Sequence, residues 1–447
     1  MMKRYLIYSF AVTLLSFSAC VDKDVPDPTS PAPVITSGTA DFSRYIAIGT
    51  SLSAGYTNGG LYQAGQQVAF PNLLAAQMKL AGGGSFTSPL FPADQPNGTG
   101  YLKLSGYNTD GTPIITQVAP QAIREQTSFL GFPVTLYTKY TGELNNYGIP
   151  GIKVNDIPDY YTFGNVNGYY DRLLAGSAGN NRTAYDQFVS SKKASFFTLE
   201  LGSNDVLDYA TSDGLTSSRV ITGQTTFSAV YKNLITTLTT VSPLLKGVLV
   251  TIPDVTMLPY FRYNTLATLN SLTQKKGLGA TNPVIQALYT PTGTYITRFA
   301  TNKDLFAITI DPDSYGGTNP ANGKPRYGID FSNPLPSSAV LDVDELARVQ
   351  TAITGYNNSI KSTATLFNYP VFDANTLFSQ LQKGITQDGV TVNADFITGG
   401  FFSLDGIHLT PRGNALVTDE LIKVINAKYG SSLPALDISK YDGVKVN

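Results

Sequence analysis

The sequence predicts an α/β fold in which a parallel sheet is covered by helices. Four short apolar runs, at residues 45–48, 195–201, 247–252 and 369–373, have the length and composition of buried strands. Segments between and after them carry apolar residues three and four positions apart, which is the spacing of one helix face. Strand-like and helix-like segments alternate along the chain, and this order is typical of parallel sheets with helical crossovers.

The ends of these runs support their assignment as strands. Gly49 follows the first run and Pro253 follows the third, and both residue types interrupt regular structure. The second run, Ser-Phe-Phe-Thr-Leu-Glu-Leu, is rich in aromatic and other residues that favour strands. The fourth run is the weakest prediction because it is short and contains Pro370.

Three helices are expected to cover the sheet. Their apolar positions are Phe227, Val230, Tyr231, Leu234 and Leu238 in the first, Leu346, Val349, Ile353 and Ile360 in the second, and Leu416, Leu421, Val424 and Ile425 in the last. The last helix has the best-defined ends. Thr410 suits its N-cap, Pro411 its first position and Gly430 its C-terminal stop.

The chain is predicted to form one domain over residues 41–430, followed by a C-terminal tail at 431–447. Two stretches, about 82–141 and 261–339, fit the strand and helix rhythm poorly and are dense in Gly, Pro, Asn, Thr and Tyr. We interpret them as insertions in the domain. A separate all-β module in either stretch is the alternative.

The N-terminus has the pattern of a bacterial lipoprotein signal. Lys3 and Arg4 precede an apolar run that is too short to span a bilayer and ends at Ser18-Ala19-Cys20. We therefore expect a signal peptide at 1–19, acylation of Cys20, a disordered Pro- and Asp-rich tether at 20–40, and a lipid anchor in the bacterial outer membrane or cell surface. An ordinary signal peptide with an incidental cysteine is the alternative.

Composition narrows the range of partners. The chain has 31 basic and 32 acidic residues and a formal net charge of -1, which argues against nucleic acid as a partner. Cys20 is also the sole cysteine, so the mature fold can contain no internal disulfide and no cysteine metal cluster.

Acid–base chemistry near neutral pH falls on His408, since the chain has one histidine. A lone histidine is more often structural than catalytic, but the Asp405-x-x-His408 spacing at the start of a helix favours catalysis. Asp405 can hold the imidazole Nδ1-H and leave Nε2 free to accept a proton. Ser51 lies directly after the first predicted strand, where open α/β sheets bind their ligands. A serine there needs a base within hydrogen-bond reach to become a nucleophile.

In these features the chain resembles the SGNH (GDSL-like) hydrolase family, whose four sequence blocks contain Ser, Gly, Asn and His in that order. The blocks are matched by Gly49-Thr50-Ser51-Leu52, by Asn146-Tyr147-Gly148-Ile149-Pro150-Gly151, by Gly202-Ser203-Asn204-Asp205, and by Asp405, His408 and Gly413. The resemblance implies a three-layer α/β/α sandwich on a parallel sheet of about five strands, flavodoxin-like in order.

The resemblance also implies a serine esterase or lipase that works through an acyl-enzyme and needs no cofactor or metal. Ser51 is then the nucleophile, His408 the base and Asp405 its orienting carboxylate. The oxyanion is held by the N–H of Ser51, the N–H of Gly151 and the side-chain amide of Asn204, with Gly148 as a competitor for Gly151. The substrate is expected to be a small-molecule, glycan or lipid ester, with specificity in the insertions.

Thr50 replaces the usual Asp of the first block, and we expect its hydroxyl to accept a backbone hydrogen bond that holds the turn. Two alternatives stay open at this stage, one for the nucleophile and one for the function. Ser53 is the alternative nucleophile. Because Thr50 departs from the family pattern, a non-catalytic surface lipoprotein that uses the fold to bind glycan or protein is the rival function.

Overall fold

A five-stranded parallel sheet forms the centre of the protein, with strand order β13-β8-β7-β1-β6. The computed structural model describes residues 34–129, 131–159, 166–176, 183–212, 219–289 and 293–446. The strands are β1 (Tyr45–Gly49), β6 (Asn146–Gly148), β7 (Phe196–Glu200), β8 (Lys246–Val250) and β13 (Val371–Phe372). The predicted parallel sheet and its four predicted strands are therefore confirmed, and β6 is a fifth strand that the apolar pattern did not reveal.

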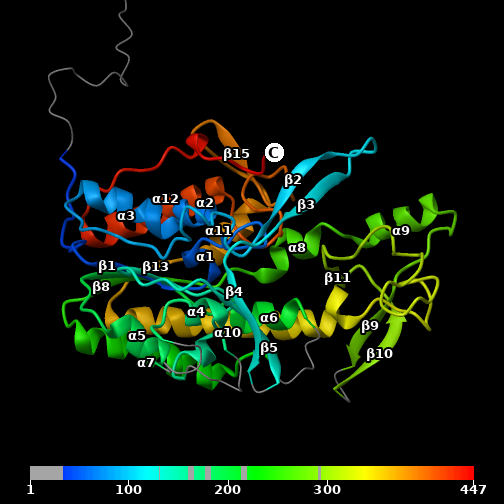
Figure 1. Cartoon of the computed structure of the whole chain (residues 1–447), viewed down its shortest axis with the longest axis horizontal. Helices are drawn as coiled ribbons and strands as arrows, with labels where there is room; N and C mark the ends of the chain where they lie inside the picture. The colour runs from blue at the N-terminus through cyan, green and yellow to red at the C-terminus, as the bar shows by residue number, and fades with distance from the viewer. Residues whose placement is uncertain are drawn as a thin grey trace, which may run out of the picture. The chain divides into compact units, whose positions relative to one another are not determined.

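Helices cover both faces of this sheet (Figure 1). One face carries α3 (Phe70–Leu80) and α12 (Pro411–Tyr429), which pack against each other. The other carries α5 (Tyr185–Ser190), α7 (Gln224–Val241) and α10 (Val343–Phe367). The arrangement is the expected three-layer α/β/α sandwich.

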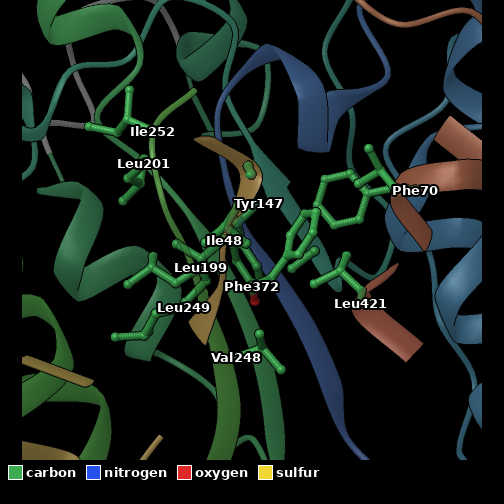
Figure 2. Close-up of a cluster of buried hydrophobic side chains, with 14 of the residues drawn as sticks. Ile48, Phe70, Tyr147, Leu199, Leu201, Val248, Leu249, Ile252, Phe372 and Leu421 are labelled. Atoms are coloured by element: carbon green, nitrogen blue, oxygen red, sulfur yellow. The ribbon is translucent and has the colours of Figure 1, made fainter. Parts of the chain in front are cut away.

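The main core fills the spaces between these layers. Figure 2 shows Ile48, Leu199, Leu249 and Phe372 of four neighbouring strands together, with Phe70 of α3 and Leu421 of α12 on one side. All of these side chains are at most 4% exposed, as continuous apolar strands covered on both faces require.

The ends of α12 agree with the sequence prediction. The Thr410 side chain accepts a hydrogen bond from the N–H of Gly413 at 3.0 Å, Pro411 is the first helical residue, and Gly430 closes the helix in the left-handed region at φ 65°. This N-cap fixes where the helix starts and therefore where the preceding loop, with His408, must lie.

Shorter elements connect the layers. They are α1 (Ser51–Ala54), α2 (Gln63–Gln67), α4 (Gly168–Asp171), α6 (Asn204–Ala210), α8 (Pro259–Arg262), α11 (Ala374–Leu381), β11 (Leu305–Phe306), β12 (Val340–Leu341), β14 (Ile385–Gln387) and β15 (Val390–Val392). The 3-10 helices in the described ranges are η1 (Val154–Asp156), η2 (Val255–Met257), η3 (Ser337–Ala339) and η4 (Ile438–Lys440).

The first insertion, at about 82–141, contains two antiparallel hairpins. They are formed by β2 (Tyr101–Tyr107) with β3 (Pro113–Val118) and by β4 (Ile123–Phe129) with β5 (Phe132–Tyr137). Val134 and Leu136 of β5 belong to the main core, so this insertion is not a separate module.

The second insertion, at 261–339, has a small core of its own. Helix α9 (Leu266–Lys275) and strand β9 (Val284–Tyr289) contribute to this core, and β9 pairs with β10 (Thr294–Phe299) in a hairpin. Its buried residues include Leu269, Ile285, Phe306, Tyr315, Leu335 and Val340. Because α9 contributes to this core, the insertion is not an all-β module.

The folded unit extends beyond residues 41–430 at both ends, since it begins at Ile35 and includes the C-terminal segment. The N–H of Thr39 donates to the carbonyl of Tyr429 at 2.8 Å, and Leu433 and Ile438 are buried in the main core. The predicted signal peptide and Cys20 lie outside the described residues. Within the described ranges, we find no helix with the length and apolar character needed to span a membrane.

Candidate active site

Ser51 lies at the carboxyl edge of the sheet, as the first residue of α1 and two residues after β1 ends. His408 and Asp405 lie in the loop that leads into α12. The Nε2 atom of His408 is 2.9 Å from the Ser51 hydroxyl oxygen, and its Nδ1 is 2.8 Å from Oδ2 of Asp405. The structure thus brings the three predicted residues into one hydrogen-bonded chain.

Asp405 is held by several donors besides the imidazole. Its Oδ1 accepts hydrogen bonds from the N–H groups of Ile407 and His408, at 2.9 and 2.8 Å, and from the Ser403 hydroxyl at 3.0 Å. Burial raises the pKa of Asp405, but the adjacent His408 and these hydrogen bonds outweigh it and hold the pKa well below its usual value. The carboxylate therefore stays ionised and requires a proton on Nδ1 of the imidazole, which directs the Nε2 lone pair at Ser51.

The segment after α1 ties the two ends of the chain together at this edge. The N–H of Gly59 donates to Asp405 Oδ2 at 2.7 Å, and Asn58 exchanges hydrogen bonds with Ser403 and Leu404 at 2.9 and 3.0 Å. The Tyr56 ring lies against the imidazole of His408, with ring centroids 4.6 Å apart. These contacts fix the imidazole relative to Ser51.

Gly151 lies in the loop after β6, and Asn204 is the first residue of α6. The Asn204 side-chain amide donates to the carbonyl of Ile152 at 3.0 Å, and the Asn167 amide donates to the carbonyl of Pro150 at 2.8 Å. Gly151 is held between these two bonds with φ at +79°, a conformation that favours glycine. Its backbone orientation is therefore fixed.

Gly148 is already occupied in a structural role. Its N–H donates to Asn146 Oδ1 at 3.0 Å inside the buried strand β6, and a Cβ there would come within 2.3 Å of the N atom of Ala54. Of the two competing glycines, Gly151 alone is exposed.

A cavity of about 880 Å³ opens beside Gly151 and Asn204. It lies among β5, η1, α4 and α6, and Tyr137 and Tyr169 line one part of it. The two rings stack with centroids 4.7 Å apart, and Tyr169 packs edge-on against Tyr56 at 6.3 Å. Tyr56 also touches His408, so the rings of Tyr169 and Tyr56 connect this cavity, which Gly151 lines, to the imidazole.

Comparison with known families agrees with this geometry. The model of the GDSL-like lipase/acylhydrolase family matches residues 45–421, which include both ends of the hydrogen-bonded chain. The chain belongs to this family. It is accordingly a carboxylic ester hydrolase with the α/β fold predicted from the sequence.

Several solved structures resemble this GDSL-family hydrolase at low identity. An α/β-hydrolase enzyme from the metagenome of Lake Arreo, Spain, is 11% identical, with a TM-score of 0.37, over 87% of this chain and 96% of its own. A lipase/acylhydrolase from Enterococcus faecalis is 11% identical, with a TM-score of 0.33, over 88% and 100%. An extracellular lipase from Streptomyces rimosus is 12% identical, with a TM-score of 0.33, over 86% and 98%. No curated protein sequence matches the chain significantly.

Thr50 of this GDSL-family hydrolase differs from the sequence expectation. Its hydroxyl does not accept a backbone hydrogen bond. It donates to Glu200, at 2.8 Å from Oε1, and its N–H donates to Oε2 at 3.0 Å. The Ser53 hydroxyl also donates to Glu200, at 3.1 Å, and Ser53 is fully buried. Ser53 therefore faces Glu200 rather than His408, and Glu200 is a residue of this edge that the sequence did not reveal.

Asp205, next to Asn204, lies beneath η1 of the hydrolase. Its Oδ2 accepts a hydrogen bond from the N–H of Val154 at 2.9 Å, and burial raises its pKa to about 7. A carboxyl group whose pKa is raised by folding stabilises the fold while it is protonated and loses that contribution as the pH rises through its folded pKa.

We therefore expect the stability of the wild type to fall, relative to Asp205→Asn, as the pH rises from about 4 to about 7, by up to about 1.4 kcal/mol per pH unit. Urea unfolding of both proteins across this range measures the difference. Parallel stability profiles for wild type and Asp205→Asn would show that folding does not raise the pKa of Asp205.

Proposed function

We propose that this protein cleaves carboxylic esters through an acyl-enzyme, with Ser51 as nucleophile, His408 as general base and Asp405 as the carboxylate that orients it. The observation that carries the proposal is the chain of hydrogen bonds from Ser51 through His408 to Asp405, at 2.9 and 2.8 Å, in a member of an ester-hydrolase family. The same three side chains act in both halves of the reaction, the formation of the acyl-enzyme and its hydrolysis.

In the first half, the Ser51 oxygen attacks the ester carbonyl carbon while His408 Nε2 accepts the hydroxyl proton. The tetrahedral intermediate then expels the alcohol, which receives that proton from His408. In the second half, water attacks the acyl-enzyme by the same route, and Ser51 regains its proton when the acid leaves. The ionised Asp405 stabilises the imidazolium that forms in each half.

The oxyanion is proposed to be held by the N–H of Ser51, the N–H of Gly151 and the amide of Asn204. The Asn204 amide carries two N–H groups and uses one on the carbonyl of Ile152, so the other can serve the oxyanion. Gly151 and Asn204 both line the cavity, where the substrate is proposed to bind. Each donor of this kind typically contributes about 3 kcal/mol to lowering the barrier.

A fluorophosphonate probe tests the proposal, because it reacts with a serine only if a neighbouring base activates it. We expect the wild type to be labelled and to hydrolyse p-nitrophenyl esters. A protein that is inert to both would instead fit the non-catalytic lipoprotein that binds glycan or protein. A panel of acyl chain lengths and acetylated sugars, run in the same assay, distinguishes lipid from sugar esters.

The cellular location forms a second part of the proposal. We propose that Cys20 is acylated and anchors the protein at the bacterial outer membrane or cell surface, on the basis of the signal-like segment before it and the absence of any other cysteine. One acyl chain binds membranes only marginally, so stable anchoring requires more than one.

We expect metabolic palmitate to label the wild type but not Cys20→Ser. We also expect the wild type, and not Cys20→Ser, to be found in the membrane fraction. The catalytic activity of the two purified proteins serves as the control for folding. Equal labelling of the two proteins would refute acylation at Cys20.

A further inference from the structure

Glu200 is the last residue of β7 and lies beside the turn that carries Ser51. It pairs in register with Gly49 of β1, and it is 5% exposed. Its side chain enters the space between the end of the sheet and α1. A glutamate in such a place is unusual, because a buried carboxyl group loses its hydration and must be compensated by hydrogen bonds.

The compensation comes from the nucleophile turn itself. Thr50 donates both its N–H and its hydroxyl to Glu200, and Ser53 donates its hydroxyl. In the part of the chain that the structure describes, no lysine or arginine forms a salt bridge with Glu200, so these residues of the turn are its partners.

This arrangement replaces the usual way of capping a helix. An N-cap threonine normally accepts a hydrogen bond from an N–H group of the first turn through its own side chain. Thr50 is the N-cap of α1 and makes no such bond. Glu200, on the neighbouring strand, instead accepts hydrogen bonds from the N–H of Thr50 and from the hydroxyls of Thr50 and Ser53.

The turn fits closely around the carboxyl group. A Cβ at Gly49 would lie 2.1 Å from the Ser53 hydroxyl and 2.8 Å from Oε2 of Glu200. With Thr50 and Ser53 both held, Ser51 between them has little freedom. Its N–H, at the first helical position, has no partner within the helix and is left for the oxyanion.

We propose that Glu200 is a positioning residue, whose carboxyl group acts through Thr50 and Ser53 to hold the Ser51 hydroxyl towards His408 and its N–H towards the oxyanion. The inference rests on the proposed nucleophilic role of Ser51. Thr50 suits this arrangement because a hydroxyl donates to Glu200, whereas the aspartate usual in this block would bring a second carboxyl group against it.

The test is Glu200→Gln, which keeps the shape of the side chain but turns one acceptor oxygen into a donor. At least one donor of the turn then faces an N–H group. We expect kcat to fall about tenfold to a hundredfold with KM within about threefold, because small displacements of a reacting atom have effects of this size. The rate of reaction with a fluorophosphonate probe should fall by the same factor.

Glu345→Gln is the matched control, since Glu345 is also a buried glutamate but caps α10, away from the nucleophile turn. It is expected to lower the melting temperature and leave kcat unchanged. If Glu200 had only a structural role, Glu200→Gln would likewise lower the melting temperature and leave kcat unchanged. Thr50→Val, which removes one of the donors, should lower kcat by itself, and its effect should be smaller in the Glu200→Gln background.

The outcomes separate this inference from the proposed function. If the wild type reacts with the probe and Glu200→Gln reacts equally fast, Glu200 does not position Ser51, while the serine mechanism stands. If Glu200→Gln does not fold, an unchanged kcat in Thr50→Val overturns the inference. A wild type that is inert to the probe would overturn the nucleophilic role of Ser51 and this inference with it.

Discussion

Replacing Ser51 by alanine is expected to reduce kcat for ester hydrolysis by at least about a thousandfold and to abolish labelling by a fluorophosphonate. The reason is that the Ser51 hydroxyl is the group within 2.9 Å of the His408 Nε2 atom, so no acyl-enzyme can form without it. Single-turnover and steady-state kinetics with p-nitrophenyl esters measure the loss.

Ser53→Ala provides the control for this prediction, because it removes a hydroxyl two residues further along the same turn. Ser53 donates to the buried Glu200, so we expect a loss of about 1–3 kcal/mol in the free energy of unfolding, and labelling that is slowed, as in Thr50→Val, but not abolished. If Ser53→Ala abolished labelling while Ser51→Ala did not, the nucleophile would be Ser53.

Replacing His408 by alanine is expected to reduce kcat at least about a thousandfold, with little change in KM. The chain contains no other histidine, so no second imidazole can take the proton from Ser51. Added imidazole should restore part of the activity, because the side chain lost from beside Tyr56 leaves a space of its own size. Measuring kcat and KM with and without imidazole tests this prediction.

The His408→Ala protein should remain folded. The main-chain bonds of the loop do not depend on the imidazole: the N–H of Ser403 donates to the carbonyl of His408 at 2.8 Å, and the N–H of His408 donates to Asp405. A melting temperature close to that of the wild type is the control. Near-normal activity in this variant would contradict the role of His408 as the base.

The features that could be predicted from the sequence are those with a strong local signal. The four apolar strands and the caps of α12 each have a pattern confined to neighbouring residues. The residue types at 51, 405 and 408 also indicated their chemistry, because a single histidine leaves no other base. The contact between Asp405 and His408, at 2.8 Å, was expected from their spacing along the chain. The approach of Ser51 to His408, at 2.9 Å, was expected from the position of Ser51 after a parallel strand and from the resemblance to a family.

The features that escaped prediction depend on contacts between distant segments. Strand β6 is three residues long, Asn-Tyr-Gly, and is a strand because it pairs with β1, not because of its composition. Glu200 sits within an otherwise apolar run, so its position gives no sign of the three hydroxyl and N–H groups that meet it from Thr50 and Ser53. The role predicted for Thr50 was wrong for the same reason, since the residue to which its hydroxyl donates, Glu200, lies 150 positions further along the chain.

The hydrogen bonds between residues 58–59 and 403–405 also bear on the order of events during synthesis. Ser51 leaves the ribosome well before the imidazole that lies against it, because His408 follows 357 positions later. Until His408 has been made, the nascent chain therefore has no imidazole beside Ser51. The proposed serine–histidine pair can therefore form only after the segments around residues 51 and 408 have both been made and have docked.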